Sequence, residues 1–141
     1  MALKSILHLS LAVSALMAAG SLLLTTVINA APKGKVFELR TYTTNEGKLD
    51  ALQARFRDHT TRIFKKHHMT NVGYWVPQDK PNTLIYIISH ESREAAKANW
   101  DAFRADPEWQ KVAKESEANG KILAKPPESV YMDATDYSPI K

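Results

Sequence analysis

The chain has 141 residues, of which 44% are hydrophobic and 24% charged, and its formal net charge is +4 at pH 7. This length and composition suit one globular domain with a short extension and exclude a disordered chain. Basic and acidic residues are interspersed, with no aromatic-rich basic run, so we expect no nucleic-acid partner. The chain has no cysteine, which excludes disulfides, thiolate metal sites and cysteine nucleophiles.

The N-terminus has the pattern of an export leader. Lys4 precedes a stretch from Ser5 to Ile28 without Asp, Glu, Lys or Arg, and the small residues Ala30 and Ala31 follow. A positive start, an apolar stretch and small residues are typical of a secretory signal peptide, so we predict a periplasmic or secreted protein. The apolar stretch is longer than usual, and an uncleaved leader that anchors the protein in a membrane is the alternative. The predicted parts are a signal peptide over 1–30, a linker over 31–34 and a domain over 35–141.

The domain begins with an alternating segment over 35–43, which predicts a strand with Glu38, Arg40 and Tyr42 on one face. Turn residues then lead into a helix from Lys48 to about His67. Its apolar stripe consists of Leu49, Leu52, Phe56, Ile63 and Phe64. His59 falls on this stripe and is predicted to face the sheet, whereas Arg55 falls on the opposite, charged face.

Two further strands are predicted over 71–77 and 83–90, joined by a hairpin-type turn. The later one is apolar on both faces and should lie in the middle of the sheet. Ser92 is a suitable N-cap for the next helix, and Asp106 followed by Pro107 begins another. A last strand is predicted over 129–134.

This order of elements is βαββαβ, which predicts an α+β, ferredoxin-like sandwich with helices on one face of an antiparallel sheet. The strands carry apolar and aromatic residues on both faces, so the face without helices should also be buried. A homodimer that stacks two sheets is the simplest solution and forms a dimeric α+β barrel.

Four short motifs, in order along the domain, resemble the NIPSNAP family. They are Phe37–Thr43 followed by Gly47-Lys48-Leu49, His67 shortly before Val72–Trp75, Asp106–Gln110, and Thr135–Pro139. The resemblance covers essentially everything after the leader and implies a dimeric α+β barrel. One departure is His68, where the family tends to have glycine; that position should favour a left-handed backbone.

The resemblance implies function only broadly. Animal members have adaptor-like roles in vesicles or mitochondria, and neighbouring dimeric-barrel families include cofactor-independent monooxygenases and haem-using enzymes. Fold analogy of this kind is a weak basis for assigning chemistry. An exported domain would not share a cytosolic adaptor role.

His59 is the candidate catalytic residue, because a histidine that faces the sheet could shuttle protons, orient a ligand or bind haem. Burial as a structural histidine is the simpler reading, since one histidine without a partner is not a catalytic set. Glu38 and Arg40 should form an ion pair, which either fixes the structure or leaves the arginine to hold an acidic ligand. The candidate ligand-pocket residues are Arg40, Tyr42, His59, Tyr74, Trp75 and Trp100.

We expect neither a metal nor a cofactor. His67 and His68 are adjacent, so on a helix their side chains diverge and cannot easily chelate one ion. Asp106 and Pro107 are explained as a helix start. Two functions remain: a homodimeric module that binds a small hydrophobic ligand or a protein partner, which we favour, and a cofactor-independent monooxygenase acting on an aromatic substrate.

Overall fold

The computed structural model describes residues 34–141, so the predicted signal peptide and residues 31–33 of the predicted linker lie outside the described part of the chain. No helix within the described range is long and apolar enough to cross a membrane. The elements are β1 (Val36–Thr43), α1 (Leu49–Arg55), the π-helical segment η1 (Phe56–Thr60), α2 (Thr61–Lys66), β2 (Thr70–Trp75), β3 (Thr83–His90), α3 (Arg93–Ala105), α4 (Pro107–Ser116) and β4 (Glu128–Asp133).

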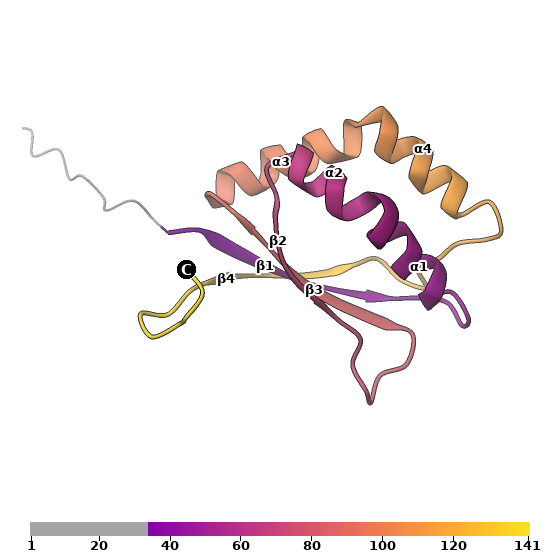
Figure 1. Cartoon of the computed structure of the whole chain (residues 1–141), viewed down its shortest axis with the longest axis horizontal. Coiled ribbons are helices and arrows are strands. Elements are labelled where there is room, and N and C mark those ends of the chain that lie inside the picture. The colour runs from indigo at the N-terminus through magenta and orange to yellow at the C-terminus, as the bar shows by residue number, and fades with distance from the viewer. Residues whose placement is uncertain (1–33) are drawn as a thin grey trace, which may run out of the picture. The chain divides into compact units, whose positions relative to one another are not determined.

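The four strands form one sheet in the order β2-β3-β1-β4, and all neighbouring pairs are antiparallel. The helices lie on one side of this sheet (Figure 1). This arrangement confirms the predicted ferredoxin-like βαββαβ fold. It also confirms the predicted interior position of β3, which pairs with β2 along one edge and with β1 along the other.

The first helix is continuous through α1, η1 and α2, but η1 winds as a π-helix. A π-turn spaces its hydrogen bonds five residues apart, so each residue advances less around the axis than in an α-helix. Thr60, four residues after Phe56, faces inward, where its hydroxyl donates to the carbonyl of Arg55 at 3.2 Å. His59 is turned out to solvent. The prediction that His59 faces the sheet is therefore wrong.

Arg55 is the second correction on this helix, because it is only 6% exposed although we predicted it on the charged face. It lies three residues after Leu52 and one before Phe56, so it borders the buried stripe. The long aliphatic part of an arginine can pack in such a position.

The core lies between the helices and the sheet and is rich in aromatic rings. Phe64 is central: its ring centroid lies 5.0 Å from that of Phe103, 5.5 Å from that of Trp100 and 6.0 Å from that of Tyr86. Edge-to-face and tilted contacts of this kind stabilise aromatic clusters beyond simple burial. Phe64 and Phe103 also line a cavity between the helices and the sheet.

Both predicted helix starts are confirmed. The Ser92 side chain accepts a hydrogen bond from the amide of Ala95 at 3.0 Å, and Asp106 accepts one from the amide of Glu108 at 2.8 Å. Asp106 does more than cap a helix, however, because it also accepts from Lys66 at 2.8 Å.

The same carboxylate contacts His67 Nε2 at 2.6 Å, so it ties the end of the first helix to the start of α4. The bonds from Lys66 and His67 hold the pKa of Asp106 well below its usual range. The cap alone therefore does not explain this residue, contrary to the prediction from the sequence.

His68 adopts the left-handed conformation that its position predicted, with φ at 58°. A non-glycine residue is less stable there because its Cβ crowds the backbone. The His68 carbonyl accepts a hydrogen bond from Asn99 Nδ2 at 3.2 Å. This contact links the turn before β2 to α3.

The face of the sheet away from the helices carries exposed apolar side chains. Trp75 is 53% exposed and Val130 is 54% exposed. The Trp75 ring folds back over Gly73, where an added Cβ would come within 2.4 Å of it, so a larger residue at this position would require the exposed ring to move. Near Phe37 the C-terminal segment covers part of this face.

Candidate functional site

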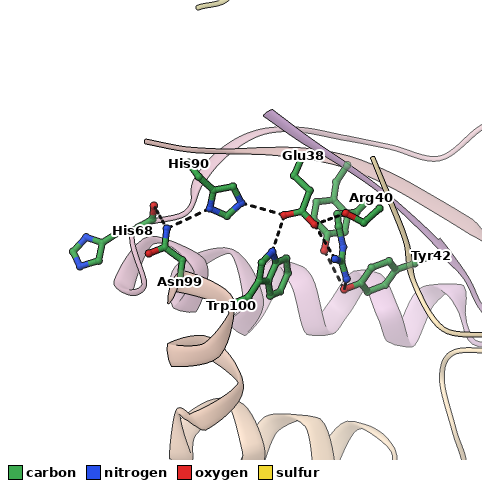
Figure 2. A network of polar contacts seen from close by, with 9 residues as sticks. Glu38, Arg40, Tyr42, His68, His90, Asn99 and Trp100 are labelled. Atoms are coloured by element: carbon green, nitrogen blue, oxygen red, sulfur yellow. Dashed lines mark hydrogen bonds and ion pairs between the residues drawn. The ribbon is translucent and has the colours of Figure 1, made fainter. Parts of the chain in front are cut away.

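A buried carboxylate lies at the centre of a polar network between sheet and helices (Figure 2). Glu38 projects from β1 toward the helices and is fully buried. One of its oxygens accepts from Trp100 Nε1 at 2.7 Å and from His90 Nε2 at 3.1 Å. The other accepts from Ser129 Oγ at 2.6 Å and from Arg40 at 2.9 Å. The carboxylate therefore joins β1, β3, β4 and α3.

These four donors control the ionisation of Glu38. Burial alone would raise its pKa, but the hydrogen bonds, led by those from His90 and Ser129, lower it to about 2. The network thus holds a negative charge at neutral pH, balanced by Arg40. A carboxylate with four donors and so low a pKa is unsuited to act as a general base near neutral pH.

The orientation of His90 is fixed by its neighbours. Asn99 Nδ2 lies 3.2 Å from the His68 carbonyl, which can only accept, so the amide nitrogen must face it. The second hydrogen of this nitrogen points to His90 Nδ1 at 3.3 Å. His90 Nδ1 therefore accepts, and Nε2 carries the proton that is donated to Glu38. This arrangement assigns a neutral His90 with a single tautomer.

Arg40 connects the carboxylate to two tyrosines. Its guanidinium lies 4.5 Å from the Trp100 ring centroid and donates to the Tyr42 hydroxyl at 3.4 Å, while its Nε has no partner. The hydroxyls of Tyr42 and Tyr86 are 3.0 Å apart. Complete burial raises the pKa of Tyr86, so its hydroxyl stays protonated. The ion pair predicted between Glu38 and Arg40 is present, and it faces the helices.

A cavity of about 340 Å³ lies next to this network, between the first helix, α4 and the sheet. Five aromatic side chains contribute to its wall, and the charged ones are few. The lining residues are Tyr42, Arg55, Phe56, Thr60, Phe64, Phe103, Trp109, Ala113, Lys114, Glu117, Leu123 and Pro127. Its mixture of aromatic surface and a few polar groups is that of a small-molecule site.

The structure does not bring the candidate residues from the sequence together in one place. Tyr42 lines the cavity, whereas Arg40 and Trp100 belong to the polar network beside it. Tyr74 is half-buried and its hydroxyl donates to Asn71.

Trp75 does not join the helix-side site, because strand alternation puts it on the opposite face from Tyr74. His59 lines a different hollow, on the outer side of α1 and α4. Within residues 34–141 no three His, Cys, Asp or Glu side chains are grouped in a way that could hold a metal ion.

Several residues of the site were not among the candidates. Arg55, which was predicted on the charged face of the first helix, lines the cavity, and so does Trp109. The spacing of Arg55 from Leu52 and Phe56 indicates a position beside the buried stripe. The charge of its side chain favoured the exposed face instead. His90 was missed because it ends a strand and has no local motif.

The topology and the cavity beneath the helices define an α+β protein of ferredoxin-like fold. The family model NIPSNAP matches residues 37–139, and the chain belongs to the NIPSNAP family. No curated protein sequence matches the chain.

Solved structures share the fold. A NIPSNAP family protein with unknown function from Agrobacterium tumefaciens is 23% identical, with a TM-score of 0.67 over 77% of this chain and 96% of that chain. An uncharacterized NIPSNAP-like domain protein from Burkholderia xenovorans is 18% identical, with a TM-score of 0.66 over 76% and 90%. A putative antibiotic biosynthesis monooxygenase from Nitrosomonas europaea is 12% identical, with a TM-score of 0.54 over 77% and 98%.

Proposed function

We propose that this protein is an exported, homodimeric module that binds a small, mainly apolar ligand in the cavity between helices and sheet. The cavity itself supports this most directly: its volume of about 340 Å³ is within the range of roughly 300 to 1,000 Å³ that is usual for ligand sites. Its aromatic walls favour a flat molecule. The neighbouring carboxylate of Glu38 has a pKa of about 2 and accepts from four donors, which suits a structural role better than proton transfer.

A substitution that fills the cavity tests this proposal. Ala113 on α4 lines the space, so Ala113→Phe would place a ring inside it. We expect the unmodified chain to bind the neutral aromatic 2-naphthamide and Ala113→Phe to lose at least about tenfold in affinity, or about 1.4 kcal/mol. Isothermal titration calorimetry measures both. Ala102→Phe, at an exposed position on α3, is the matched control and should bind normally. Equal affinity in all three chains would contradict binding in this cavity.

The alternative function is a cofactor-independent monooxygenase that acts on an aromatic substrate. Its support is the fold shared with a putative antibiotic biosynthesis monooxygenase, together with the aromatic cavity. The exposed position of His59 removes the base that this alternative first relied on. A phenol that binds in the cavity should then stimulate oxygen uptake by the unmodified chain but not by Ala113→Phe. This result would favour the enzyme over the binding module.

The homodimer is supported by the exposed apolar face of the sheet. Val130 is 54% exposed and lies beside Leu39 of β1 on this face. Val130→Arg should leave the single chain folded, because the side chain has room in solvent, but it would place unpaired charge in an interface between two sheets. We expect size-exclusion chromatography with mass detection to give two chains for the unmodified protein and one for the variant. A single-chain mass for the unmodified protein at micromolar concentration would refute the dimer.

Export is supported by the uncharged apolar stretch after Lys4. The mass of the protein recovered from its native host distinguishes the two fates of the leader: loss of residues 1–30 indicates a cleaved signal peptide, and a full-length, membrane-associated chain indicates an anchor. A full-length chain in the cytosol would contradict export.

A further inference from the structure

Arg55 is a buried cation whose charge is poorly compensated inside the protein. Its side chain is 5% exposed, and the nearest carboxylate, Glu117, lies 3.7 Å away and is itself 38% exposed. Its contact with Ser116 Oγ is long, at 3.4 Å, and its buried Nε has no hydrogen-bond partner. A buried guanidinium with incomplete hydrogen bonding is costly, so its retention calls for an explanation.

Arg55 lines the cavity, and it also borders the outer hollow that contains His59. Its guanidinium is 5.4 Å from the ring centroid of Trp109, which lines the cavity as well. Lys114 adds a second positive charge to the lining, whereas Glu117 is its one acidic residue. The charged groups that line this space therefore sum to a net positive charge. A cavity of this charge favours an anion over a neutral or cationic ligand.

A second donor faces the same space. Tyr42 lines the cavity, and its oxygen lies 3.0 Å from that of Tyr86. Two hydroxyls that bond to each other use one hydrogen between them, and Arg40 also donates to Tyr42. One phenolic hydrogen of the pair is therefore not used by these contacts and is available to a ligand oxygen.

We propose that Arg55 selects the ligand of this cavity as a small aromatic carboxylate, with the guanidinium holding the carboxylate and the aromatic walls holding the ring. Arginine presents planar paired donors that match a carboxylate, and it forms stronger hydrogen bonds to an ionised acceptor than to a neutral one. This inference rests on the proposed binding function, because it names the class of ligand that the same cavity takes.

The test compares two probes of nearly the same shape, 2-naphthoate and 2-naphthamide, by isothermal titration calorimetry on the full chain. We expect the carboxylate to bind about tenfold more tightly than the amide. Arg55→Gln should reduce the affinity for 2-naphthoate to about that for 2-naphthamide and leave the amide unaffected. Arg57→Gln, which changes an exposed arginine of the same helix, should preserve the difference.

The outcomes separate the two proposals. Equal affinity of the unmodified chain for both probes overturns the carboxylate inference and leaves the cavity as a binding site. Binding of neither probe overturns the proposed function together with the inference. A preference for 2-naphthoate that survives in Arg55→Gln overturns the role of Arg55. If Arg55→Gln fails to fold, Arg55→Lys replaces it, because lysine keeps the charge and lacks the planar donors. A reduced preference for 2-naphthoate in Arg55→Lys supports the role of Arg55 in holding the carboxylate. An unchanged preference overturns that role.

Discussion

Glu38→Gln should destabilise the protein by about 3 to 5 kcal/mol, the usual cost of removing one partner from a buried ion pair. Each carboxylate oxygen accepts two hydrogen bonds, one pair from His90 and Trp100 and the other from Ser129 and Arg40. A glutamine has one acceptor oxygen and one NH₂ group, so in one orientation its NH₂ group faces the N–H donors of His90 and Trp100, and in the other it faces Arg40, while the Ser129 hydroxyl can turn to accept. Arg40 also loses its counter-charge.

Urea unfolding gives the free energy of unfolding for this comparison. Glu128→Gln is the matched control on β4, because Glu128 is 59% exposed and contacts Lys125 at the surface; a change within about 0.5 kcal/mol is expected there. A loss below about 1 kcal/mol in Glu38→Gln would show that the network contributes little to stability.

The pH dependence of stability provides an independent reading of the same carboxylate. Its pKa is lowered from 4.5 to about 2 in the folded protein, so the folded state favours the ionised form. The resulting stabilisation is present above about pH 4.5 and is lost as the pH falls toward 2. At about 1.4 kcal/mol per pKa unit it amounts to about 3 kcal/mol. In Glu38→Gln this part of the acid dependence should disappear, whereas Glu128→Gln should keep it.

Phe64→Ala should cost about 3 to 5 kcal/mol, the range for truncating a buried phenylalanine. Phe64 is 1% exposed and its ring contacts those of Phe103, Trp100, Tyr86 and Phe56. Because Phe64 also lines the cavity between helices and sheet, its truncation enlarges that cavity. Urea unfolding measures the loss.

Tyr137→Ala is the control, since Tyr137 is 83% exposed and its removal should change stability by no more than about 0.5 kcal/mol. A ligand that occupies the cavity should recover part of the stability of Phe64→Ala, because a molecule that binds only the folded state stabilises it. If saturating 2-naphthamide stabilised neither Phe64→Ala nor the unmodified chain, the cavity would not be its binding site.

The sequence by itself determined the elements and their order. Period-two alternation in 35–43 predicted β1 to within one residue at its start, because alternation reflects local strand geometry, and the apolar run over 83–90 predicted β3 with the observed bounds. The starts of α3 and α4 were predicted from Ser92 and Asp106, since an N-cap bonds to amides within its own turn. The left-handed His68 was predicted from the family resemblance, because the family tends to have glycine at this helix end.

Only the tertiary structure decided which side chains form the site. The π-turn that carries the exposed His59 has no recognisable local pattern, and a 3.6-residue stripe places His59 wrongly. The four donors around Glu38 come from β1, β3, β4 and α3, so no spacing along the chain reveals them. The burial of Arg55 depends on α4 packing against the first helix and supplying Trp109. Local structure thus follows from hydrogen bonding between near neighbours, whereas the cavity arises where distant segments pack together.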